Sequence, residues 1–133
     1  MTTETEVKEI TLNFPQNLPV CERKDEIIRC IRENAVVVIS GETGSGKTTQ
    51  IPKMALEAIG LYSKLKVACT QPRRLAAVTL AERVAAEMNT PCGGIVGYKH
   101  RFEDKTSPST RIKFITDGIL LAQLKSDASL SEY

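Results

Sequence analysis

The sequence of 133 residues predicts an α/β fold with a largely parallel sheet in a three-layer arrangement. Two short runs rich in apolar and β-branched residues, 35–40 and 66–70, are each followed by a segment with helical periodicity. Neither run alternates with polar residues, which is typical of strands buried on both faces. Because strands and helices alternate along the chain, parallel strands joined by crossover helices are expected.

The first half of the chain predicts a helix on either side of the first apolar run. Apolar residues recur at helical spacing within residues 19–34, which indicates an amphipathic helix that ends near Asn34. The range Lys47–Ile59 is expected to form a second helix that Gly60 stops. Pro52 lies one turn into this helix, where it removes a hydrogen bond and should bend it.

The second half continues the alternation with shorter elements. A long helix is predicted over residues 74–88, with small and apolar residues along one face. Residues 95–98 and 111–116 are two further strand candidates, separated by a turn-rich stretch. Asp117 is placed to cap a last helix that runs to Lys125.

Composition excludes several classes of protein. The chain is 41% hydrophobic and 26% charged, with a net charge of +2, so any nucleic-acid signal must be local. No apolar run approaches the roughly 20 residues of a membrane span, and the first residues lack the pattern of a secretory signal, so a cytoplasmic location is expected. The four cysteines show no metal-binding spacing and are expected to be free thiols: Cys21, Cys30, Cys69 and Cys92.

One motif carries clear chemistry. The segment GETGSGKT, Gly41–Thr48, fits the phosphate-loop pattern GxxxxGK[ST] at every fixed position and stands between a predicted strand and a helix. Its glycines allow backbone N–H groups to point at phosphate oxygens, Lys47 would bridge the β- and γ-phosphates, and Thr48 would coordinate Mg²⁺. The predicted nucleotide-binding residues of this segment are Gly41, Glu42, Thr43, Gly44, Ser45, Gly46, Lys47, Thr48 and Thr49.

A second constellation follows the second predicted strand. The segment TQPRR places Arg73 and Arg74 at the carboxyl end of that strand, where ligands of open α/β sheets bind. Guanidinium groups there suit phosphate-backbone contacts. Solvated surface charge is the alternative interpretation of such a pair.

Four blocks together resemble a known family. GETGSGKTTQ, ACTQPRRLAA, VGYKHRF and TDGILL, in this order and spacing, resemble the first motor domain of a DEAH-box RNA helicase of superfamily 2. The lead-in FPQNLPVCERKDEI resembles the bacterial HrpA branch, and the resemblance runs from about Ile10 to Tyr133. It implies a lead at residues 1–16 and a partial RecA-like ATP-binding domain at residues 17–133.

The resemblance also implies roles for individual residues. Arg73, Arg74, Thr116 and Asp117 would contact the sugar-phosphate backbone of single-stranded RNA, and Arg83 would stack on the base of ATP or another nucleoside triphosphate. Each residue has a simpler alternative: Arg83 as surface charge, Asp117 as a helix cap, and Glu42 as a solvated loop acid.

The 133 residues depart from the family in one respect. They hold no DEAH motif, and their one Asp-Glu pair, Asp25 and Glu26, lies in the first predicted helix. The resemblance implies that catalysis also needs a second, C-terminal helicase domain in cis, so we expect negligible ATP hydrolysis by these residues alone. In the RecA-like sheet that the resemblance implies, residues 36–39 would also lack neighbouring strands and expose an apolar edge.

Two other functions stay open. A small kinase or another P-loop NTPase would use the same phosphate loop, but it would be expected to carry a substrate-binding residue where TQPRR stands. A non-catalytic remnant that binds nucleotide or RNA is the other alternative.

Overall fold

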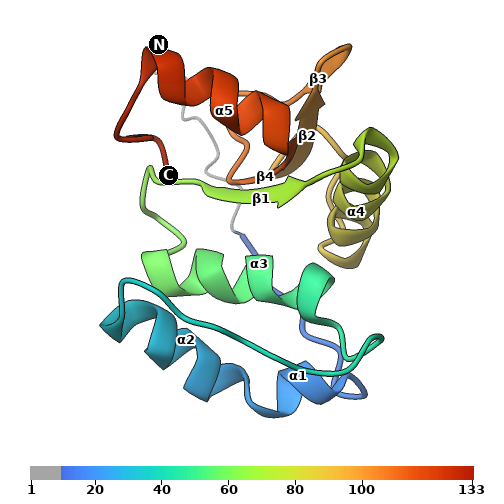
Figure 1. The fold of residues 1–133 in the computed structure, drawn as a ribbon. Coiled ribbons are helices and arrows are strands. Elements are labelled where there is room, and N and C mark those ends of the chain that lie inside the picture. The colour runs from blue at the N-terminus through green and yellow to red at the C-terminus, as the bar shows by residue number, and fades with distance from the viewer. Residues whose placement is uncertain (1–9) are drawn as a thin grey trace, which may run out of the picture.

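The computed structural model describes residues 10–133 as a mixed α/β fold around a mostly parallel four-stranded sheet (Figure 1). The strand order is β1-β4-β2-β3, in which β4 is parallel to both β1 and β2, and β3 is antiparallel to β2. The strands span Val67–Gln71 (β1), Val96–His100 (β2), Glu103–Lys105 (β3) and Ile112–Thr116 (β4). The predicted α/β class and the parallel pairing are therefore confirmed.

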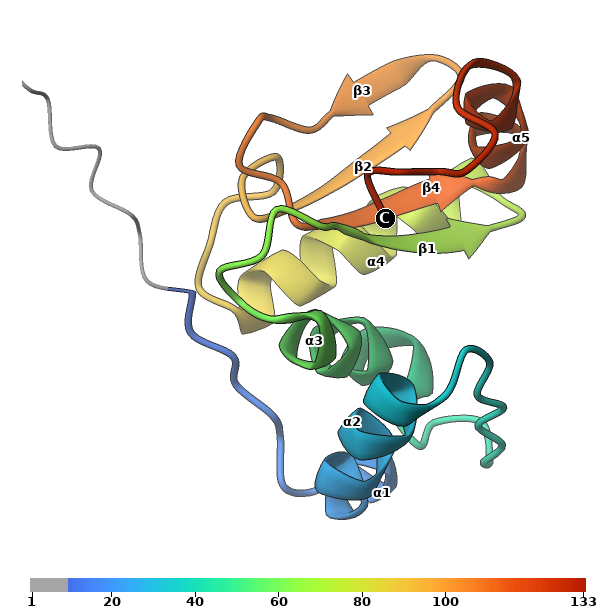
Figure 2. The same ribbon diagram turned by 90° about the vertical axis from the view of Figure 1, so that its left-hand side faces the viewer.

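Helices pack on the sheet and on one another. They span Pro19–Glu22 (α1), Lys24–Glu33 (α2), Lys47–Ile59 (α3), Arg74–Glu87 (α4) and Asp117–Ser126 (α5). Helix α4 packs against β2 and β4, α3 lies against β1, and α2 packs against α3 on the side away from the sheet (Figure 2). Helix α5 lies on the other side of β1 from α3 (Figure 1).

The buried side chains form two clusters. The larger lies between the sheet and helices α3 and α4, and its largest fully buried members include Leu56, Val84, Ile112 and Phe114. The smaller lies between α2 and α3 and contains Val20, Ile27, Ile28 and Met54. Helix α3 contributes to both clusters, so it joins the α1–α2 pair to the sheet.

Most predicted elements form close to their expected bounds. Helix α3 spans the predicted residues, passes through Pro52 without interruption and ends at Gly60, which has φ +100°. The helix predicted over residues 19–34 is divided at Arg23, whose φ of −107° and ψ of 21° leave the helical region. The last helix is capped one residue earlier than predicted, because Thr116 has the extended N-cap backbone and Asp117 is the first helical residue.

The strand predicted over residues 35–40 is the main error. Within residues 10–133 this segment pairs with no strand, and the Val36 and Val38 residues are 81% and 89% exposed. Ile39 alternates with them and packs against the smaller cluster. One side of the segment packs toward the smaller cluster, while Val36 and Val38 face solvent because no element of the described chain covers them, and no described strand pairs with its backbone.

The sequence analysis missed strand β3, which lies in the turn-rich stretch. Its residues Glu103–Lys105 are all charged and exposed, and they form a short edge strand against β2. Such a strand carries no hydrophobic pattern, and its charges are typical of protected sheet edges. Gly97 permits the close approach, because a Cβ at this position would lie 2.4 Å from the carbonyl oxygen of Lys105.

Arg111 fixes the connection between α3 and β1. Its guanidinium donates hydrogen bonds to the carbonyl oxygens of Gly60 (3.0 Å), Leu61 (2.6 Å) and Leu65 (2.8 Å). These carbonyls lie just after α3, where the chain has left the helix and has not yet entered the sheet. The buried guanidinium of Arg111 therefore supplies hydrogen bonds to three carbonyl oxygens of a loop that forms few backbone hydrogen bonds of its own.

Replacement of this cation should destabilise the fold. We expect Arg111→Met to lower the free energy of unfolding by about 2–4 kcal/mol, because partly buried carbonyls lose charge-assisted hydrogen bonds. Urea denaturation followed by circular dichroism measures the change. Arg29→Met, at an exposed position of α2, is the matched control and should remain near the wild-type value. Equal stability of the two variants would show that Arg111 does not hold this loop.

Candidate functional site

The glycine-rich segment forms an exposed loop at the start of α3. Residues 41–44 are exposed, and the N–H of Ser45 donates to the carbonyl of Glu42 at 3.1 Å to close a turn. Gly44 and Gly46 adopt left-handed backbone conformations, with φ of +86° and +94°. Glycine adopts these angles without the steric cost that other residues have, which explains the motif at this reversal of the chain.

Helix α1 holds the loop from behind. The N–H of Val20 donates to the carbonyl of Ser45 at 3.1 Å. A Cβ on Gly46 would lie 2.9 Å from Cδ1 of Leu18, so the backbone at Gly46 is pressed against the residues that open α1. The loop is thus fixed by the N-terminal part of the chain as well as by α3.

The loop presents the polar groups that an anion needs. Gly46 is the N-cap of α3, and the first intrahelical bond runs from the N–H of Gln50 to its carbonyl at 2.9 Å. The preceding N–H groups of the first turn therefore have no helical acceptor. The ammonium group of Lys47 donates to the carbonyl oxygens of Gly41 and Glu42, so it lies across the loop.

Two hydroxyl side chains add to the polar groups of the loop. The hydroxyl of Thr48 belongs to an exposed residue at the first turn of α3. The buried Oγ of Ser45 has no hydrogen-bond partner among residues 10–133. An unpartnered buried hydroxyl in this glycine-rich loop is a group that could bond a ligand oxygen.

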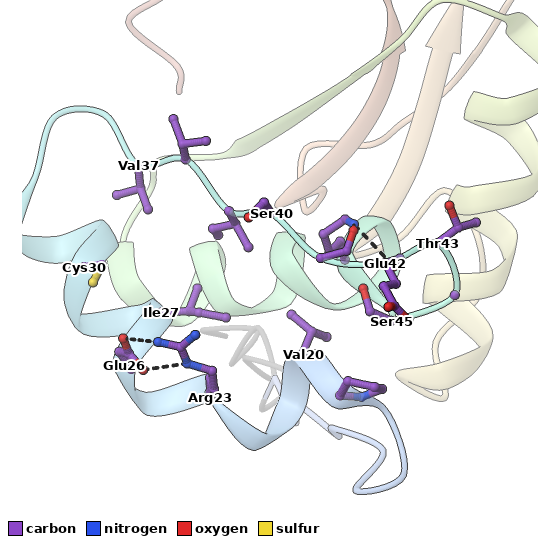
Figure 3. A pocket seen from close by; sticks show the side chains of 16 residues that line it. Val20, Arg23, Glu26, Ile27, Cys30, Val37, Ser40, Glu42, Thr43 and Ser45 are labelled. Carbon is purple, nitrogen blue, oxygen red and sulfur yellow. Dashed lines mark hydrogen bonds and ion pairs between the residues drawn. The ribbon is translucent and has the colours of Figure 1, made fainter.

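A cavity of about 540 Å³ lies beside the loop, between the α1–α2 pair and the extended chain that leads into the loop (Figure 3). Its walls are mostly apolar and include Ile27, Cys30 and Val37, while Glu42 to Ser45 form one end. Arg23 and Glu26 form a two-bond ion pair at its rim, with N–O distances of 2.8 and 2.6 Å. This pair holds the pKa of Glu26 below its usual range.

The predicted RNA-contacting residues lie together at one edge of the sheet. Gln71 of β1 is the register partner of Thr116 of β4, so Arg73 and Arg74 leave the sheet beside Thr116 and Asp117. Arg73, Arg74 and Asp117 are exposed. The glycine-rich loop and the start of α4 lie at the same end of β1, on the right of Figure 1.

Arg83 lies on α4, and a single side chain, that of Glu87, stands between it and helix α3. Its side chain is 64% exposed, and its Nε lies 3.8 Å from Oε1 of Glu87. The carboxylate of Glu87 in turn accepts a hydrogen bond from Gln50 of α3. Arg83 is therefore linked through one side chain to the first turns of the helix that follows the loop.

The sequence analysis missed Phe102, which lies beside the arginines. It follows β2 and is 68% exposed, with the guanidinium groups of Arg74 and Arg101 at 4.6 and 5.5 Å from its ring centroid. His100 lines a shallow hollow together with Pro72, Arg73 and Arg74. The run His-Arg-Phe, in which basic and aromatic residues are interleaved, was the signal in the sequence.

The remaining sequence predictions concern cysteines, metals and membranes. All four cysteines are free, and burial raises the pKa of the Cys69 thiol to about 12. No cluster of His, Cys, Asp and Glu in residues 10–133 could hold a metal ion. No helix in the described part of the chain is long and apolar enough to cross a membrane.

Comparison with known proteins places the chain among relatives of ATP-dependent RNA helicases. It is 53% identical over 120 residues to the ATP-dependent RNA helicase HrpA homolog of Haemophilus influenzae, in a match that covers 90% of this chain. It is also 50% identical over 122 residues to the ATP-dependent RNA helicase HrpA of Escherichia coli, in a match that covers 92% of this chain. No family model matches the chain.

These identities confirm the resemblance to HrpA-like helicases that the motifs indicated. The chain spans 9% of the length of each of these two relatives. It is therefore homologous to a small part of each of these helicases.

The two left-handed glycines should respond differently to a methyl group. A Cβ at Gly44 meets nothing within 4 Å, whereas a Cβ at Gly46 meets Leu18 and Val20. We expect Gly44→Ala to cost about 1 kcal/mol of unfolding free energy from backbone strain alone, and Gly46→Ala roughly 2–4 kcal/mol. Urea unfolding curves of the two variants test this. Equal losses would contradict the packing of the loop on α1.

Proposed function

We propose that this chain is part of the first RecA-like domain of a helicase, which binds a nucleoside triphosphate with Mg²⁺ and the backbone of single-stranded RNA. In this proposal the sheet belongs to a three-layer P-loop fold, and ATP is the principal nucleotide. The observation that carries it is that an exposed phosphate loop and an exposed pair of arginines share one end of the sheet. Homology to helicases supports it.

The phosphate loop would hold the nucleotide. The N–H groups at the start of α3 would bind phosphate oxygens, with Ser45 Oγ as a further donor. Lys47 would release the carbonyls of Gly41 and Glu42 and bridge the β- and γ-phosphates. Thr48 would hold Mg²⁺, which neutralises phosphate charge when bound.

The other end of the nucleotide would meet Arg83. A guanidinium plane can stack on any base, because stacking reads a flat face and not the base edges. We therefore expect little discrimination among ATP, GTP, CTP and UTP.

The edge formed by Arg73, Arg74, Thr116 and Asp117 would hold one RNA strand. Contacts of this kind go to phosphate and sugar, which suits a protein that must bind any sequence. The exposed ring of Phe102 extends the same surface and would give a base a stacking platform. Thr116 can contact RNA while its backbone caps α5.

Hydrolysis needs groups that these residues do not supply. No acidic residue corresponding to the DEAH motif stands in the 133 residues. We propose that the acids and the second helicase domain must act in cis, and that the 133 residues alone bind nucleotide without appreciable turnover. A non-catalytic binder of nucleotide and RNA is therefore the second candidate function for this stretch.

RNA binding should depend on the arginine pair. We expect the Arg73→Ala/Arg74→Ala variant to weaken binding of oligouridylate at low salt. The slope of log K against log salt should fall in magnitude by about 1.4, which is roughly 0.7 for each lost phosphate contact. Fluorescence anisotropy with a labelled RNA at several salt concentrations measures both quantities.

Two further variants separate the sites. Arg29→Ala removes an exposed charge from α2 and should leave the slope unchanged. Lys47→Ala should abolish binding of a fluorescent ATP analogue with Mg²⁺ while RNA binding without nucleotide persists. An unchanged RNA slope in the double arginine variant would reject the proposed RNA edge.

A further inference from the structure

Glu87, at the C-terminal end of α4, contacts three side chains with one carboxylate. Its Oε2 accepts hydrogen bonds from Gln50 Nε2 and from Lys53 Nζ, both at 2.9 Å. Its Oε1 lies 3.8 Å from Nε of Arg83. Two of these partners belong to the phosphate-loop helix α3, and the third is the arginine proposed to meet the base.

The two α3 partners of Glu87 are buried, and one of them is linked by hydrogen bonds to the glycine-rich loop. Lys53 and Gln50 are both 0% exposed. The Nε2 of Gln50 also donates to Oγ1 of Thr49 at 3.0 Å, and that hydroxyl is placed to donate to the carbonyl of Gly46 at 3.4 Å. A chain of polar contacts therefore runs from Glu87 to the left-handed glycine that begins α3.

Burial makes the position of Glu87 well defined. The ammonium group of Lys53 has two acceptors, the carboxylate of Glu87 and the carbonyl of Asn13 at 2.7 Å. A buried cation without its carboxylate is costly, so the pair holds the end of α4 in a fixed place against α3. The other oxygen of that carboxylate, Oε1, lies 3.8 Å from Nε of the largely exposed Arg83.

An exposed arginine that already has such a partner loses less conformational entropy when it binds a ligand. A free guanidinium samples many rotamers, and ordering it on binding lowers the affinity. An ion pair with a fixed carboxylate restricts this sampling and leaves the flat face of the guanidinium available for stacking.

From these contacts we propose that Glu87 is a positioning residue of the nucleotide site, which holds Arg83 at a set place relative to the phosphate loop. Glu87 does not contact the nucleotide. It joins the group that meets the base to the helix whose first turn meets the phosphates. The inference rests on the proposed nucleotide site and names what sets its geometry.

The test must avoid an unpaired buried lysine, so Lys53→Met serves as the background. In Lys53→Met, Glu87 keeps both Gln50 and Arg83. In Lys53→Met/Glu87→Gln, the new amide oxygen can still accept from Gln50, but the charge that orients Arg83 is gone. The two proteins therefore differ chiefly in the Arg83 contact, and circular dichroism confirms that both are folded.

The measurement compares ATP with inorganic tripolyphosphate, each with Mg²⁺, by isothermal titration calorimetry. Tripolyphosphate has no base and should not sense Arg83. We expect Glu87→Gln in this background to weaken ATP binding about two- to fivefold and to leave tripolyphosphate binding unchanged. Arg83→Ala should then cost less in the double variant than in Lys53→Met alone.

Controls separate the possible failures. Glu82→Gln makes the same charge change at an exposed position of α4 and should leave both ligands unaffected. Equal weakening of ATP and tripolyphosphate, or no change in ATP binding, would overturn the role of Glu87. Failure of Lys53→Met and of the wild-type chain to bind either ligand would instead overturn the proposed nucleotide site.

Discussion

The reversal of the chain at Gly44 and Gly46 is the constraint on which the rest of the site depends. Gly44 and Gly46 flank Ser45 and both have left-handed backbone conformations, and the chain reverses there into α3, whose first N–H groups have no helical acceptor. The turn is fixed from behind by Val20 and Leu18, so the N-terminal part of the chain is needed for the loop to keep its shape. Phosphate binding by backbone groups requires this kind of rigidity, because the donors must already be in place when the anion arrives.

The parallel sheet supplies the second half of the arrangement. Because β1 and β4 are parallel neighbours, the segments that follow them emerge at one edge, and the pairing of Gln71 with Thr116 sets their distance. Helix α4 then runs from that edge back to α3, where Glu87 meets Gln50 and Lys53. The edge proposed for RNA and the loop proposed for ATP therefore lie at the same end of β1, and α4 links that edge to α3 through Glu87.

The sequence predicted the elements that carry their own pattern and missed those that depend on distant partners. Helix α3 formed at its predicted bounds because Gly46 and Gly60 mark both ends locally. The apolar run 35–40 looked like a buried strand, but a strand needs a neighbour, and Val36 and Val38 have none among the described residues. The all-charged β3 and the carboxylate of Glu87 could not be predicted, because their roles arise from Gly97 and from α3 across the fold.

The central claim is that one end of this sheet holds two ligands at two adjacent places. Backbone amide spectra of the ¹⁵N-labelled chain, recorded while tripolyphosphate with Mg²⁺ and then oligouridylate are added, test it most directly. The account predicts that the phosphate shifts the amide signals of residues 44–49, and that RNA shifts those around Arg73, Arg74 and Thr116. Phosphate-induced shifts confined to the apolar cavity beside α2, or RNA-induced shifts at the opposite end of the strands, would contradict it.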